Sequence, residues 1–195
     1  MEALHKTKVM VRIAILGAIA FLLTFAKIPL PFFPSFLKLD FSDIPAVVAA
    51  LAYGPAGGIG VAMIRLVVDL LKSSSGGVGQ LANFIAAAAY LIPLGLVYKH
   101  AKTLRGYCAG AGLGSIFMIV IACLFNYFVL IPAYALIFGG MDAIVGMASA
   151  INSSVTGLGT LVVFAIAPFN ILKALLISVL GYLLYKPLTP LFRQA

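Results

Sequence analysis

The sequence predicts an all-α integral membrane protein with six transmembrane helices, short second and third helices, both termini cytoplasmic, and one transmembrane domain over residues 1–195. Of the 195 residues, 64% are hydrophobic and only 9% are charged, and the mean hydropathy is +1.18. A soluble domain of this length needs far more polar surface. The basic residues lie mostly in short loops and tails, as expected of a membrane protein.

Three helices are expected in the first half of the chain, at 9–26, 43–53 and 56–71. The first ends at "KIPLPFFPSFLKLDFSD", where three prolines prevent a continuous helix. Ser42 or Asp43 is expected to cap the second helix, because Ser and Asp are favoured at the N-cap position. Pro45 is tolerated in the first turn of that helix. That helix stops at "YGPAGG" after about ten residues, or ~15 Å. It is therefore too short to cross a ~30 Å hydrocarbon core alone.

Three further helices are expected in the second half, at 80–98, 108–138 and 160–185. The break "KSSSGGVG" precedes the fourth helix, and the basic loop "KHAKTLR" follows it. Pro132 should kink or end the fifth helix. A connector rich in Gly, Ser and Asn, at 139–159, separates the last two helices.

The distribution of Lys and Arg predicts the orientation. With cytoplasmic termini, the inner side carries eight basic residues: Lys6, Lys8, Arg12, Lys99, Lys102, Arg105, Lys186 and Arg193. The outer side then carries three: Lys27, Lys38 and Lys72. This asymmetry obeys the positive-inside rule, so topology rather than nucleic-acid binding explains the net charge of +8. The longest and most irregular loops all face outward, where a binding site can open.

Polar residues within the apolar segments are the candidate functional residues. Arg65 and Asp69 are four apart on one helix and are interpreted as a self-neutralising structural pair near the outer interface. Asn83 and Asn126 each have a plain alternative, a hydrogen bond to a neighbouring helix worth about 0.6 kcal/mol.

Asn170 and Lys173 are more informative, because a spacing of three places them on one helix face. A central lysine costs ~2.5–3.5 kcal/mol on the insertion scale, and its own segment contains no carboxylate within reach. One explanation is an ion pair with a carboxylate elsewhere in the bundle: Asp40, Asp43 or Asp69. The other is an outward-opening pocket in which Lys173, Asn170 and Asn126 bind a small heterocycle.

Other functional classes have little support in the sequence. Neither histidine lies within a span, and no metal-ligand cluster or pair of intramembrane carboxylates occurs, so no metal or cofactor is expected. The chain has no G-x-x-x-x-G-K-[ST] motif, so any ATP hydrolysis must come from another subunit. An intramembrane enzyme acting on a lipid and a self-sufficient channel or secondary carrier remain as alternatives.

Two motifs resemble a known family. The stretch "KLDFSDIPAVVAALAYGPAGGIGV" (38–61) is similar to the first loop and second helix of the S components of energy-coupling factor (ECF) vitamin transporters. "PFNILK" (168–173) is similar to the riboflavin-binding members. The resemblance implies a subunit in the plasma membrane of a prokaryote that binds riboflavin from outside. It also implies association with a transmembrane coupling subunit and two ABC-type ATPases.

The same resemblance assigns roles to individual residues. It implies flavin contacts from four polar side chains, a loop closing over the ligand, and docking of the coupling subunit on an A-x-x-x-A patch of the first helix. The flavin contacts are Asn83, Asn126, Asn170 and Lys173; the loop residues are Leu39 and Asp40; the docking residues are Ala14 and Ala18. A lysine also suits a carboxylate ligand, so a pantothenate-type relative remains the alternative.

Overall fold

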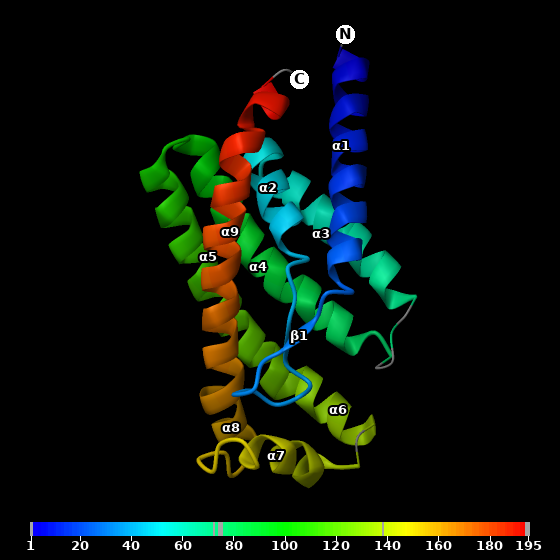
Figure 1. Cartoon of the computed structure of the whole chain (residues 1–195), viewed down its shortest axis with the longest axis vertical. Helices are drawn as coiled ribbons and strands as arrows, with labels where there is room; N and C mark the ends of the chain where they lie inside the picture. Colours follow the sequence, from blue (N-terminus) through cyan, green and yellow to red (C-terminus); the bar gives the residue numbers. More distant parts are fainter. Residues whose placement is uncertain (1, 72, 74–75, 138, 194–195) are drawn as a thin grey trace.

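The computed structural model describes residues 2–71, 73, 76–137 and 139–193, mostly as helix (Figure 1). Lys72, assigned above to the outer side, and Phe138, the last residue of the fifth expected span, lie outside the described residues. The helices are α1 (Glu2–Leu23), α2 (Ile44–Tyr53), α3 (Pro55–Leu70), α4 (Val78–His100), α5 (Leu104–Phe125), α6 (Ile131–Ile137), α7 (Met141–Ser149), α8 (Leu158–Leu161) and α9 (Ala167–Arg193). The π-helical turns η1 (Asn126–Leu130) and η2 (Val162–Ile166) join α5 to α6 and α8 to α9.

Three continuous helical stretches of the described chain are long and apolar enough to cross a membrane: Val78–His100, Leu104–Ile137 and Leu158–Leu188. Helix α1 has 22 residues, but its first half carries three basic side chains. It begins at Glu2 rather than at residue 9, and α9 runs on to Arg193 rather than stopping at residue 185. Helical hydrogen bonding thus continues beyond the apolar segments, where charged side chains are solvated.

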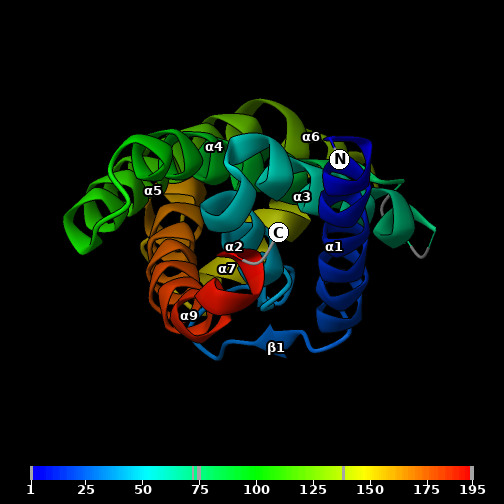
Figure 2. The ribbon, with the colours of Figure 1, turned by 90° about the horizontal axis from the view of Figure 1, so that it is seen from above.

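Helix α2 lies at the centre of the bundle, surrounded by α1, α3, α4 and α9 (Figure 2). Eight of its ten residues are buried. Small residues allow its neighbours to approach closely: a Cβ built on Gly58 of α3 would lie 2.7 Å from Ala50, and one built on Gly181 of α9 would lie 2.5 Å from Val47. Gly54, with φ of +80°, makes the tight turn from α2 into α3.

The expectation that the side chain of Ser42 or Asp43 caps α2 is wrong. Asp43 occupies the N-cap position, but no side-chain hydrogen bond caps the helix. The carboxylate and the Ser42 hydroxyl are used in the buried contacts described below. The negative charge nevertheless sits at the positive end of the α2 dipole, which is favourable.

The two π-helical turns each precede a proline in the same way. η1 ends two residues before Pro132, and η2 ends two residues before Pro168. Each closes with a hydrogen bond to a carbonyl five residues back, from Ile131 to Asn126 and from Ala167 to Val162. The wider turn accommodates a proline ring that would clash with the carbonyl four residues earlier. The helix therefore continues past Pro132, although an end at this proline was one of the two outcomes expected from the sequence.

The connector expected at 139–159 is more ordered than its composition suggests, because it contains α7. Ile144 and Ala148 of this helix are buried against Ile131, Leu161 and Ile166. Apolar residues at this spacing give α7 one buried face, which holds the connector against the ends of the long helices.

The two ends of the molecule differ in charge and in structure. The start of α1, the end of α9 and the α4–α5 turn lie at one end, at the top of Figure 1. This end carries Lys6, Lys8, Lys99, Lys102, Arg105 and Lys186. The strands β1 (Ile28–Pro29) and β2 (Lys38–Leu39), which pair antiparallel, lie toward the opposite end with α6 and α7. We call these the basic end and the loop end.

Candidate ligand-binding site

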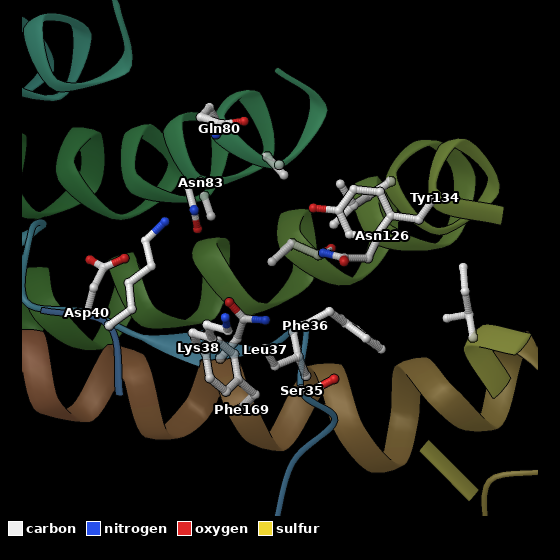
Figure 3. Close-up of a pocket in the computed structure, with 18 of the residues that line it drawn as sticks. Ser35, Phe36, Leu37, Lys38, Asp40, Gln80, Asn83, Asn126, Tyr134 and Phe169 are labelled. Atoms are coloured by element: carbon white, nitrogen blue, oxygen red, sulfur yellow. Dashed lines mark hydrogen bonds between the residues drawn. The ribbon is translucent and has the colours of Figure 1, made fainter. Parts of the chain in front are cut away.

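A cavity of about 410 Å³ lies at the loop end of the molecule. Its walls come from the loop at 35–40, the start of α4, the α5–η1–α6 stretch, α7 and the start of α9. Figure 3 shows Asn83, Asn126 and Phe169 facing the same space from three different helices. Residues distant in sequence thus converge on one volume, which is the usual arrangement of a small-molecule site.

Four of the six sequence-predicted ligand residues line this cavity: Asp40, Asn83, Asn126 and Asn170. The other two, Leu39 and Lys173, are not among the lining residues. Leu39 is 5% exposed and pairs with Ile28 in the small hairpin. Lys173 is 4% exposed, and its Nζ lies 3.5 Å from Asn83 Oδ1, directly behind the lining.

Asn126 and Asn170 are held in the same way. The Asn126 amide donates to the Ala122 carbonyl at 2.7 Å, and the Asn170 amide donates to the Ile166 carbonyl at 2.8 Å. Within the described part of the chain, the buried Asn126 Oδ1 accepts no hydrogen bond. A buried acceptor without a donor is costly. This atom is therefore available to a ligand N–H or O–H in the cavity.

Asp43 is the centre of a buried ionic network beside the cavity. Its carboxylate pairs with Arg65 of α3 and, at 2.8 Å, with Nζ of Lys173 on α9. The side chains of all three are at most 5% exposed. The structure thus supplies a carboxylate for Lys173, and Asp43 was one of the three candidates considered above. A buried charge of this kind is tolerated only with such a partner.

The network continues into the loop that precedes α2. Arg65 donates to the Ser42 hydroxyl at 2.7 Å. The Ser42 hydroxyl in turn donates to Asp40 Oδ1, which also accepts the Ser42 N–H at 3.0 Å. Asp40 therefore shapes the chain before α2 as well as lining the cavity. The chain of contacts connects the loop to α2, α3 and α9.

Arg65 therefore has a partner that its spacing to Asp69 does not reveal. The guanidinium contacts Asp43 and Ser42, on a different segment of the chain. Asp69, one turn further along α3, is 8% exposed and lines the cavity. This end of α3 thus belongs to the wall of the site and to the buried network at once.

Several lining residues were not identified from the sequence. Lys27 and Lys38 were counted only as outer charges, yet both line the cavity. Phe169 also lines it, and its ring meets Phe33 edge-on at 5.5 Å between centroids. The one available signal was position, since Phe169 directly precedes Asn170. Phe36, Leu37, Gln80, Ala82, Tyr134, Ile144 and Met147 also belong to the newly found lining.

The chemistry of this lining suits binding. Apolar and polar side chains supply about equal parts of the wall. The polar part combines four charged side chains with four amides, which supply directional hydrogen bonds. Among the described residues, no group of three or more His, Cys, Asp or Glu side chains is placed to hold a metal ion. A flat heterocycle with polar atoms along one edge matches such a wall.

Comparison with known proteins gives consistent results. The family model described as "ECF transporter, substrate-specific component" matches residues 8–185. The riboflavin transporter RibU of Staphylococcus aureus (strain TCH60) is 36% identical over 191 residues, 98% of this chain and 95% of the relative. The riboflavin transporter FmnP of Bacillus subtilis (strain 168) is 35% identical over 192 residues, covering 97% and 96%.

A solved structure is also similar in fold. It is described as the S component of a bacterial ECF transporter, and it superposes with a TM-score of 0.75 at 35% sequence identity. The match covers 95% of this chain and 98% of the other.

Proposed function

Because the chain belongs to the family of substrate-specific components of ECF transporters, we propose that it binds riboflavin at the loop end and delivers it across the membrane. The family is one of transporters, so an enzymatic role is set aside. The chain aligns over nearly its whole length with riboflavin transporters at 35–36% identity. The start of the first motif, at Lys38 and Asp40, and the second motif, at Phe169 and Asn170, line the cavity described above.

The observation that carries the proposal is the cavity lined by asparagines. Its volume of about 410 Å³ lies within the range of small-molecule sites. The isoalloxazine ring of riboflavin is a large apolar plate with carbonyl acceptors and an N–H along one edge. The unfilled acceptor of Asn126 matches that N–H, and the aromatic wall around Phe169 matches the plate.

The direct test is the absorbance spectrum of the chain purified in detergent. Co-purified riboflavin would give the yellow flavin bands, and protein stripped of ligand should quench riboflavin fluorescence saturably. Pantothenate and thiamine, tested in the same assay, should not compete. Absence of both bound flavin and saturable quenching would refute the riboflavin assignment, and competition by pantothenate would redirect it.

We also propose six membrane-crossing helices with both termini in the cytoplasm of a prokaryotic cell. The support is the charge of the basic end, which carries six of the basic residues named above. In this orientation the riboflavin cavity opens outside the cell, at the end covered by the proline-rich loop. The substrate would thus be captured on the side from which it is imported.

The proposed partners are a transmembrane coupling subunit and two ABC-type ATPases. The chain has no phosphate-binding P-loop of its own. Ala14 and Ala18 are exposed on α1, whereas Ile13 and Gly17 of the same helix contact Gly60 and Ile64 of α3. The exposed face of α1 therefore carries two small residues, Ala14 and Ala18, among larger apolar side chains. Small residues four apart allow close packing of another helix.

Replacing Ala18 with tryptophan should disrupt coupling and spare binding. The indole would separate α1 from a docked helix, so riboflavin uptake by cells carrying the complete transporter should fall about tenfold or more. The purified variant should keep its riboflavin affinity, because the residue is remote from the cavity. Ala109→Trp, an exposed position on α5, is the matched control. Normal uptake by the Ala18 variant would contradict docking at this face.

Lys173 is proposed to act on the flavin from behind the lining. Two acceptors surround its ammonium, Asp43 at 2.8 Å and Asn83 at 3.5 Å. An ammonium has three protons, so one remains for a flavin acceptor.

Lys173→Met should weaken riboflavin binding roughly 10- to 100-fold, because hydrogen bonds to charged groups contribute about 1.5–3 kcal/mol. Asp43 retains Arg65 as a partner, so the fold should survive. Fluorescence titration of the purified variant measures the loss. Lys186→Met, an exposed lysine on the same helix, serves as the control. Unchanged affinity would leave Lys173 with the structural role alone.

A further inference from the structure

A second cavity, of about 630 Å³, lies at the basic end of the molecule. The first turns of α1, the end of α2 and the α4–α5 turn form it. Three lysines line it: Lys6, Lys99 and Lys102. It shares no lining residue with the riboflavin cavity and lies at the opposite end of the bundle. Nothing in the proposed transport function depends on it.

The acidic residues of the chain are placed almost entirely elsewhere. The chain has five. Asp40 and Asp43 belong to the buried network, and Asp69 lines the riboflavin cavity. Asp142 lies on α7 at the loop end. Glu2 alone belongs to the basic end, against six basic residues there. The basic end therefore carries an excess of positive charge, which attracts anions.

The rest of the cavity wall is apolar. Val9, Met10, Ala50 and Leu51 line it beside the lysines. Met10 is 68% exposed and lies four residues after Lys6, on the same face of α1. Positive charge and apolar surface thus meet in one cavity. An amphiphile with an anionic head and a hydrocarbon chain complements both parts.

We propose that this cavity binds an anionic phospholipid, with the headgroup phosphate between Lys6, Lys99 and Lys102 and an acyl chain against the apolar part of the cavity wall at Val9 and Met10. Basic pockets between membrane helices on the cytoplasmic side are suited to anionic headgroups. Lysine binds phosphate as a point charge, without the geometry that a guanidinium requires. The cavity is open, so the lipid exchanges with the bilayer.

Native mass spectrometry of the purified chain tests the proposal. The protein is equilibrated with mixed micelles containing equal amounts of phosphatidylglycerol and phosphatidylcholine. Wild type should retain phosphatidylglycerol selectively. Lys99→Gln/Lys102→Gln should retain it about twentyfold less, since each basic residue near an anionic surface contributes about fivefold. Riboflavin affinity, measured in parallel, should not change.

The matched control is Lys8→Gln/Arg105→Gln, which removes the same charge from the same end at exposed positions outside the cavity. It should retain phosphatidylglycerol like wild type. An equal loss in both double variants would show only general attraction to the basic end and would overturn the proposal. So would retention without headgroup preference, or binding of inorganic phosphate in place of lipid. A loss of coupling-subunit association with unchanged lipid retention would likewise assign the cavity to that partner instead.

Discussion

Asp43→Asn is expected to destabilise the chain by about 3–5 kcal/mol, the usual consequence of removing one partner from a buried ionic network. Asp43 is the common acceptor of Arg65 and Lys173. An amide in its place leaves two buried cations without their shared counter-charge. The same contacts attach α2 to α3 and α9, so the loss should reach the packing of the whole bundle.

Thermal unfolding of the purified chain in detergent, with and without riboflavin, measures this effect. Asp142→Asn, at an exposed acidic position on α7, is the control and should change stability by no more than about 0.5 kcal/mol. The double variant Asp43→Asn/Lys173→Met should recover part of the loss, because one of the two stranded cations is gone. Wild-type stability in the single variant would show that the network is not needed for folding.

Ala82→Phe is expected to weaken riboflavin binding roughly 10- to 100-fold, because forcing an extra ring into an occupied site costs about 1–3 kcal/mol. Ala82 is half-buried on α4 and lines the cavity between Gln80 and Asn83. The new ring has open space to enter in the empty protein, so the fold should tolerate it. The conflict arises only when the ligand arrives.

Fluorescence titration with riboflavin measures the loss, and thermal unfolding verifies that the empty variant remains folded. Ala109→Phe adds the same ring at an exposed position on α5 and should bind normally. If Ala82→Phe binds riboflavin as tightly as wild type, the ligand does not occupy this cavity.

The sequence was most informative at polar and charged residues that lie within apolar helical segments. A lysine and an asparagine three apart in an apolar helix required an explanation, and the structure has both buried on α9 beside the cavity. The asparagines on three separate helices were identified by the same reasoning and by family resemblance. Each is a polar group that would be costly in a membrane without a partner.

Contacts between residues on distant segments could not be predicted from the spacing of residues in the sequence. From the local sequence, Asp43 is predicted only as a helix cap. It becomes the counter-ion of Lys173 because α2 packs between α3 and α9. Lys27 and Lys38 were interpreted as topology signals, because their place beside the cavity depends on how the loop folds back. α7 was missed because its apolar face is short and surrounded by Gly and Ser.

The π-helical turns have a consequence for how this sequence is compared with its relatives. A π-helical turn holds one more residue than the α-helical turn it replaces. Each residue of an α-helix advances the chain by about 100°. Side chains beyond η1 and η2 are therefore out of phase with those before them. A single helical wheel drawn over Leu104–Ile137 misplaces the residues after η1, Ile131–Ile137. Alignments of this family should therefore treat the segments on either side of each turn as separate registers. A one-residue gap at the turn between them reflects the extra residue of the π-helical turn.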